Sequence, residues 1–335
     1  MSIGDRLNAL DRRQQQTPGV RFVAAVIKKF GDDQGGQLAA LISYYGFVSL
    51  FPLLLVMVTI LGFVLHGDQA EQQKILNGTL GQFPLISEQL KLHSLKGSTA
   101  GLVVGIVGSL LAGMGITGAT QMAFNRVWAV PFKHRPNFIF SRLRGLGLLA
   151  ILGTISIIST VAGGFVGTGA HSVLADVTGV VVALLANLAL FMAAFKLLTA
   201  ADLSWRTLLP GVITASILWE LLHILGGYYV DHTLKHTEPL YGFFAVVLGL
   251  LAWLYIGAQL TMISAEVNVV KARHLWPRSF FSDPLLDADR RALTHSAETE
   301  ERIHEENVDV TFDGPAEEPD GSHADAPAGP SGQPR

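Results

Sequence analysis

The sequence predicts an all-α membrane protein with six transmembrane helices, both termini in the cytoplasm and amphipathic outer-face helices between spans 1 and 2. Residues 38–65 contain no charged side chain, and a helix of that length crosses the roughly 30 Å hydrocarbon core of a bilayer. Half of all residues are hydrophobic and 15% are charged, whereas soluble domains carry about a quarter charged residues. Most classes of soluble enzyme are thereby excluded.

Six apolar segments along the chain are long enough to be spans. Between the first two, residues 66–98 turn polar but keep Ile and Leu at near-helical intervals, interrupted by glycines and a proline. We expect short amphipathic helices there, lying at the membrane interface. The predicted spans are residues 38–65, 99–124, 145–166, 177–199, 208–229 and 241–269.

The orientation follows from Lys and Arg, which remain on the cytoplasmic side of spans. Of the 24 Lys and Arg residues, 20 lie in the N-terminal arm, the second and fourth connections and the C-terminal region. The alternate loops hold the other four. Both termini are therefore expected in the cytoplasm.

Residues 1–37 form a basic arm in which Val and Phe alternate with cations at helical spacing. Arg21, Lys28 and Lys29 interrupt an apolar stripe that includes Phe22 and Val26. One interpretation is an amphipathic helix against anionic lipid headgroups; the other is a helix packed beneath the bundle. Nucleic-acid binding is disfavoured, because interspersed Asp residues weaken the positive field.

The C-terminal region, residues 271–335, is acidic and rich in Pro and Gly toward its end. Such a composition buries too little apolar area to offset the entropy of ordering. We expect cytoplasmic disorder from about residue 285, with a cytoplasmic protein as the partner that this tail would bind. The rest of the chain is expected to contact membrane lipids, and the sequence does not indicate an oligomeric state.

Small and polar residues mark the first two spans. The second contains Gly101 and Gly105 in a GxxxG pair, followed by four further glycines. These favour close helix packing, or alternatively a hinge for alternating access. In the first span Pro52 removes a backbone hydrogen bond, and Ser43, Tyr44 and Tyr45 are placed to bond the freed carbonyls or to line a cleft.

Glu220 and His223 are the sharpest candidate site, an ionisable pair at i, i+3 in span five. A carboxylate at membrane depth costs about 2.5 kcal/mol or more, so such residues usually face the bundle interior and mark function. The structural alternative is a polar contact that fixes helix register. A di-metal carboxylate site would need a second Glu-x-x-His copy, which the chain lacks.

Other polar groups point to structural roles. Glu266 and Asn268 end span six, and we expect Glu266 to pair with Lys271, Arg126 or Lys196. The loop histidines His232 and His236 have i, i+4 spacing, but a solvated turn is the better interpretation than a metal site. Cysteine is absent, which excludes disulfides and thiol chemistry. No cofactor or metal is predicted.

Several motifs along this framework resemble the YihY/BrkB family of bacterial inner-membrane proteins, which includes the YhjD proteins. The likeness spans about residues 21–271 and rests on the motifs in combination. They are the stretch LAALISYYGFVSLFPLLL with Pro52, Asn125-Arg126-Val127-Trp128, Gly211 with Trp219, Tyr241-Gly242, Trp253-Leu254-Tyr255, and Ala265-Glu266-Val267-Asn268.

The resemblance implies a six-span protein of the cytoplasmic membrane, linked to envelope integrity and suspected of transport. Some members have been labelled ribonuclease BN. Metal-dependent ribonucleases need clustered His and Asp ligands such as HxHxDH, and no such motif occurs among the eleven histidines. We therefore expect neither nuclease nor other enzymatic activity.

The leading functional hypothesis is a transporter or flippase-like protein for a lipid-derived or amphiphilic substrate. Glu220 would bind a substrate cation or a proton, and His223 would tune its charge near neutral pH. Ser43 and Tyr44 complete the candidate site. The alternative is a non-transporting scaffold that supports envelope integrity through its tail.

Overall fold

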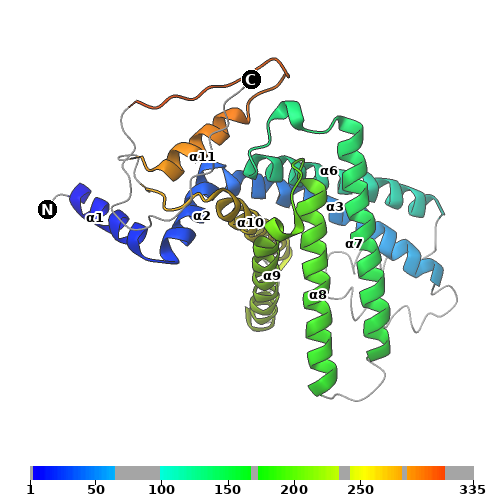
Figure 1. Ribbon diagram of the computed structural model, residues 1–335. Coiled ribbons are helices and arrows are strands. Elements are labelled where there is room, and N and C mark those ends of the chain that lie inside the picture. Colours follow the sequence, from blue (N-terminus) through cyan, green and yellow to red (C-terminus); the bar gives the residue numbers. More distant parts are fainter. Residues whose placement is uncertain (1–2, 65–98, 167–172, 234–241, 281–284, 314–335) are drawn as a thin grey trace.

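The computed structural model describes residues 3–64, 99–166, 173–233, 242–280 and 285–313, and within these ranges the chain is helical without strands. Figure 1 shows the long helices gathered into a bundle, with α1, α2 and α11 on one flank. In chain order the elements are α1 (Ile3–Gln16), α2 (Val20–Asp32), α3 (Gly35–Val64), α6 (Thr99–Val127), the 3₁₀ turn η1 (Phe132–His134), α7 (Phe138–Val166), α8 (Val173–Leu198), α9 (Trp205–Thr233), α10 (Gly242–Arg273) and α11 (Asp287–Glu298).

The six long helices coincide with the six predicted apolar segments. Their ends lie within four residues of the predicted ones, except that α7 begins seven residues earlier, at Phe138. In the described part of the chain, four stretches are long and apolar enough to cross a membrane. These are Gly35–Val56, Thr99–Val127, Trp205–Gly226 and Val247–Arg273. The six-span topology stays a prediction, and the expected outer-face helices in residues 66–98 lie outside the described ranges.

Helix α6 packs along α3 through its glycines. A Cβ atom at Gly105 would lie 2.9 Å from Val56 Cγ2, and one at Gly115 would lie 2.7 Å from Tyr45 Cδ1. Two backbones approach this closely only where a side chain is missing. The structure therefore supports the packing role of these glycines.

The buried apolar core lies at one end of the bundle, where α6, α8 and α10 end and α9 begins. Phe124, Phe195, Leu208 and Met262 meet there and are almost fully buried. Along the rest of the helices large apolar side chains remain exposed, including Val104 and Ile224 at 63% and 66%. Exposed apolar flanks are the surface that lipid would cover.

Helix α2 closes the packed end of the bundle. Ala25 and Val26 on one face are buried in the core, and Phe22 meets Trp276 edge-on at 5.3 Å between ring centroids. On the opposite face Val23 and Ile27 are exposed. The arm thus packs beneath the bundle with one face and leaves a second apolar face free.

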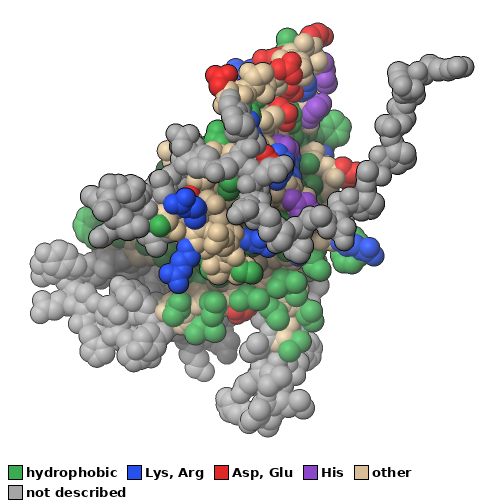
Figure 2. Space-filling view, turned by 60° about the vertical axis from the view of Figure 1, so that its left-hand side comes forward, with side chains coloured by type: hydrophobic (Ala, Val, Ile, Leu, Met, Phe, Trp, Pro, Cys, Tyr) green, Lys and Arg blue, Asp and Glu red, His purple; other side chains and the backbone are tan. Residues whose placement is uncertain are grey.

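The expected disorder from residue 285 is wrong for residues 285–313. Helix α11 and the chain after it lie over α2 and the end of α10 (Figure 1), and Asp289 in α11 is fully buried. The prediction treated acidic side chains as solvated, whereas Asp289 lies between Lys28 and Arg278. Residues 314–335 lie outside the described ranges. In Figure 2 acidic side chains gather at the top of the molecule, and among the described residues a band of apolar side chains lies below them.

Candidate functional site

Glu220 occupies a polar position within the helical bundle. Its Oε1 accepts a hydrogen bond from Asn187 Nδ2 at 2.7 Å, which joins α9 to α8. Glu220 lies about 22 Å along α9 from Trp205, because each residue adds 1.5 Å. Its half-buried carboxylate therefore sits well inside the stretch that is apolar enough to span a membrane. The amide of Asn187 offers a donor that lipid cannot supply.

His223, one turn further along α9, lies among aromatic rings and not against Glu220. It meets Trp219 edge-on at 5.4 Å between centroids and Trp253 of α10 at 5.9 Å. Its side chain is exposed at the surface of the described residues. The predicted pair therefore shares one helix, but the hydrogen-bond partner of Glu220 is Asn187.

Two glycines make room for the tryptophans that flank His223. A Cβ atom at Gly226 would lie 1.9 Å from the ring of Trp253, and one at Gly257 would lie 2.8 Å from that of Trp219. The α9 and α10 backbones each leave a notch that a ring of the other helix fills. Trp219 and Trp253 thus fix the spacing of α9 and α10 beside the candidate site.

Ser43 and Tyr44 lie on a different surface of the bundle. They line an open, largely apolar groove of about 400 Å³ between α3 and α10, together with Leu251 and Tyr255. The Ser43 hydroxyl donates to the Leu251 carbonyl at 3.3 Å, so it bridges to α10. Neither Glu220 nor His223 lines this groove, so the four predicted site residues do not share one cavity in the part of the chain that the structure describes.

The asparagines of two family motifs tie helix ends together. Asn125 Oδ1 accepts from the backbone N–H of Ala200 at 2.7 Å, which holds the end of α6 to the chain after α8. Asn268 Oδ1 accepts from the Gly211 N–H at 2.6 Å. Trp128 is buried after α6, and its carbonyl accepts from Arg273 at 2.6 Å. These motif residues hold the packed end of the bundle together.

The close packing of α9 against α10 requires a glycine at position 211. A Cβ atom there would lie 2.2 Å from the Ser264 carbonyl oxygen and 2.4 Å from Asn268 Nδ2. Only glycine allows α9 to approach α10 at this point. Pro52, by contrast, packs its ring against Gly108 of α6, where a Cβ atom would lie 3.0 Å away.

The expected pairing of Glu266 is structural, but the partner differs from those predicted. Its Oε2 lies 3.8 Å from Lys29 Nζ, and both side chains are almost fully buried. Lys196 and Lys271 are exposed, and Arg126 pairs with Glu300. The correct cation was missed because Lys29 belongs to an arm whose charges we expected to meet headgroups or solvent.

A second charged cluster, around Asp289, was not predicted. Asp289 Oδ1 lies 2.8 Å from both Lys28 Nζ and Arg278 Nε, and the Ser279 N–H donates to Oδ2 at 3.0 Å. Burial opposes ionisation, but these donors outweigh it and hold the pKa of Asp289 below its ordinary value. Asp11 of α1 accepts from Ser279 Oγ at 2.7 Å. The cluster thus joins α1, α2 and α11 to the chain after α10.

Some predicted positions cannot be placed. Tyr241 and His236 lie outside the described residues, and Gly242 opens α10. Within the described ranges, no group of three His, Asp or Glu side chains is arranged to hold a metal ion.

Long apolar helices with polar groups fixed inside them define a multi-pass helical membrane protein. The chain belongs to the family described as Virulence factor BrkB, whose model matches residues 26–279. The predicted family resemblance is thereby confirmed.

Relatives support the same assignment. Inner membrane protein YhjD of Escherichia coli (strain K12) is 28% identical, over 75% of this chain and 81% of YhjD. Putative ribonuclease-like protein YfkH of Bacillus subtilis (strain 168) is 24% identical, over 74% of this chain and 94% of its own. A UPF0761 membrane protein of Stenotrophomonas maltophilia (strain R551-3) is 25% identical, over 79% of this chain and 64% of the length of that relative. No solved structure matches the chain.

Proposed function

We propose that this protein is a transporter, flippase-like in action, for a lipid-derived or amphiphilic substrate. The observation that carries the proposal is the half-buried Glu220 carboxylate, held by Asn187 within the bundle. A carboxylate at that depth costs about 2.5 kcal/mol or more, and a purely structural contact could be made without charge. Glu220 would bind a substrate cation or a proton.

The proposal is tested by reconstituting the full chain in vesicles containing fluorescent NBD-phosphatidylglycerol or NBD-phosphatidylethanolamine. Wild type should carry inner-leaflet probe to the outer leaflet, where dithionite reduces it. Glu220→Gln should slow this reduction at least tenfold, while Asp202→Asn, at an exposed loop carboxylate, should leave it unchanged. Equal rates for wild type and Glu220→Gln would remove Glu220 from the proposed role.

We also propose six spans with both termini in the cytoplasm of the bacterial inner membrane. The relatives named as membrane proteins support the location, and the uneven division of Lys and Arg supports the orientation. In this orientation α2, α11 and the charged clusters face the cytoplasm.

A non-transporting scaffold is the second candidate. One observation favours it: residues 285–313 are held against the bundle by Asp289, so the C-terminal region presents a fixed surface to a cytoplasmic partner. Replacing Glu305 and Asp309, two exposed acidic residues of this surface, with Lys distinguishes the two. A scaffold that acts through this surface should lose its envelope phenotype, whereas a transporter should retain probe transfer.

An enzymatic role is not part of the proposal. YfkH is named ribonuclease-like, and the absence of nuclease activity in the present chain stays a prediction. Incubating the purified protein with RNA and divalent metal ions is the direct check.

A further inference from the structure

The outer face of α2 carries a row of apolar side chains that remain largely exposed. Val20, Val23 and Ile27 recur at i, i+3 and i+7 and are 49%, 56% and 55% exposed. We call these three side chains the apolar row. The opposite face of α2 already packs into the core through Ala25 and Val26. A second apolar face is unfavourable in water, so the apolar row indicates contact with another apolar surface.

The contacts of α2 place this row where the long helices end. Lys29 of α2 donates to the carbonyl of Val127, the last residue of α6, at 3.3 Å. Phe22 contacts Trp276, which follows α10. Helix α2 ends at Asp32, and the stretch that is apolar enough to cross a membrane begins at Gly35. Helix α2 therefore lies at the level where the chain enters the bilayer.

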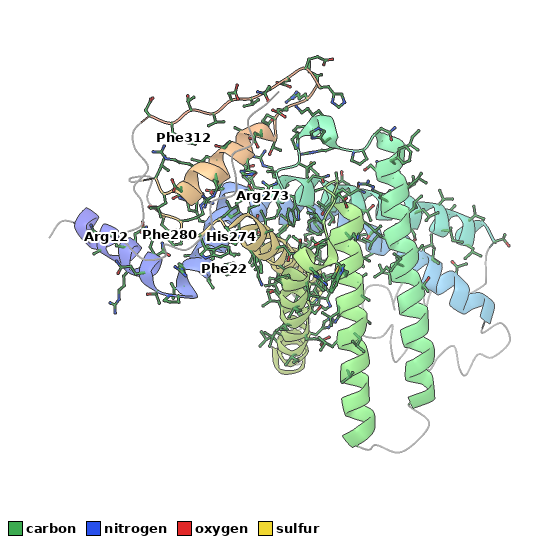
Figure 3. The ribbon with its side chains drawn as sticks, viewed as in Figure 1. Arg12, Phe22, Arg273, His274, Phe280 and Phe312 are labelled. Carbon is green, nitrogen blue, oxygen red and sulfur yellow. The ribbon has the colours of Figure 1, made fainter. Side chains whose placement is uncertain are left out.

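The charges of α1 and α2 leave the exposed surface of these helices basic. Arg12 and Arg13 are exposed and Arg21 is half-buried, and none of the three forms an ion pair among the described residues. In Figure 3 Arg12 lies on α1, at the outer end of this flank. The described acidic side chains of the two helices have partners in the protein: Asp11 accepts from Ser279 Oγ and the Phe280 N–H, Asp32 pairs with Arg278, and Asp33 pairs with Lys29.

A shallow groove joins the basic residues to the apolar row. It lies at the corner between α1 and α2, measures about 270 Å³ and is lined by Arg13, Gln14, Thr17 and Val20. Arg21 follows Val20 directly, about 100° round the helix. Cations at the edge of an apolar row are typical of helices that lie on anionic membranes. A guanidinium group also has the planar donors that suit a phosphate.

We propose that the outer face of α2 binds anionic phospholipid, with the apolar row in the adjoining membrane leaflet and Arg13 and Arg21 on the lipid phosphates. A second copy of the chain fits this face less well, because a two-fold contact would bring the same arginines together. The proposal rests on the membrane placement of the long helices and not on transport, so its outcome is independent of the test of Glu220.

Spin-label accessibility in lipid nanodiscs tests this face directly, since the chain has no native cysteine. A nitroxide at Val23→Cys in the full chain should collide readily with oxygen and poorly with a water-soluble nickel chelate. The bilayer for this measurement contains phosphatidylcholine and phosphatidylglycerol in equal parts. The matched control is Ile303→Cys, at an apolar side chain of similar exposure after α11, where the label should collide readily with the nickel chelate.

Two results of this measurement would overturn the proposal. If the labels at positions 23 and 303 are equally accessible to the nickel chelate, the apolar row faces water. If the label at position 23 is protected from both oxygen and nickel, a protein surface covers the row, either a second copy of the chain or another partner.

The headgroup preference is tested with the same label. Its protection from nickel should increase severalfold as phosphatidylglycerol replaces phosphatidylcholine. Combining Arg13→Gln with Arg21→Gln should remove most of this increase, because each cation near an anionic surface adds to the attraction. Arg302→Gln, at an exposed cation after α11, should leave the increase unchanged. Protection that is the same in both lipids, or that survives the loss of both arginines, would contradict the binding of anionic phospholipid.

Discussion

Buried polar residues in this protein differ in what they contact, and the contact decides the role of each. Asn125 and Asn268 accept hydrogen bonds from the backbone N–H groups of Ala200 and Gly211. These bonds hold neighbouring segments in a fixed geometry. Asp289 meets two cations, whereas Glu220 meets a neutral amide. Asp289 is therefore a structural charge, whereas Glu220 forms no ion pair among the described residues and is the carboxylate for which we propose a ligand.

Gly211→Ala should destabilise the protein strongly. The new Cβ would lie 2.2 Å from a backbone oxygen of α10, so α9 and α10 must separate and the Asn268 bond must stretch. Overpacking of this kind costs about 3 kcal/mol. The measurement is the apparent melting temperature in detergent, with Gly249→Ala as the control because its Cβ would meet nothing within 4 Å. Similar melting temperatures would show that the two helices are not in close contact.

Asp289→Asn should loosen the C-terminal segment and change the pH dependence of stability. Removing one partner of a buried ion pair costs about 3 kcal/mol. Because folding lowers the pKa of Asp289, its contribution is complete above the unfolded value of about 3.9 and is lost as pH falls through the folded value. Wild type should therefore lose its advantage over the variant in acid. Asp287→Asn, exposed in the same helix, is the control and should match wild type.

At the scale of elements, hydrophobic runs predicted the long helices well because a helix in lipid needs an uninterrupted apolar stretch. Helix α7 begins earlier than expected because Phe138, Ile139 and Phe140 precede Arg142 and Arg144, and the two cations were taken as a loop. Helix α11 was missed because its stability depends on Asp289 meeting Lys28 and Arg278, residues far away in the sequence. Composition alone contains no such information.

Truncation should separate the two parts of the C-terminal region. Removing residues 285–335 deletes Asp289 and leaves the buried Arg278 with Asp32 as its remaining acidic partner. We therefore expect the free energy of unfolding to fall by about 3 kcal/mol. Removing residues 314–335 leaves every described contact of this cluster intact and should not change the melting temperature. Limited proteolysis provides the readout, since cleavage in the arm should accelerate in the longer deletion alone.

For the whole molecule, the packed core and the charged clusters lie at one end, and exposed apolar helices make up the rest. This division follows from the solvent: lipid needs no buried apolar core, whereas the end that carries the charges must satisfy them. The sequence singled out Glu220 and His223, and their role as a site stays a prediction. It could not reveal Asn187 as the partner of Glu220, nor that α10 separates Ser43 from α9, because both depend on how the helices pack.

The orientation can be measured without removing native thiols, since the chain has no cysteine. Asp202→Cys should react with a membrane-impermeant maleimide only after the cells are disrupted, and Ser94→Cys should react in intact spheroplasts. The reverse pattern would invert the proposed topology.

The most direct test of the proposed transport is the amount of inner-leaflet NBD-phospholipid that becomes accessible to dithionite in sealed vesicles containing the wild-type protein. Reduction should continue past the outer-leaflet fraction until nearly all probe is bleached. If vesicles with correctly folded protein stop at the same plateau as protein-free vesicles for both headgroups, a flippase-like function is contradicted.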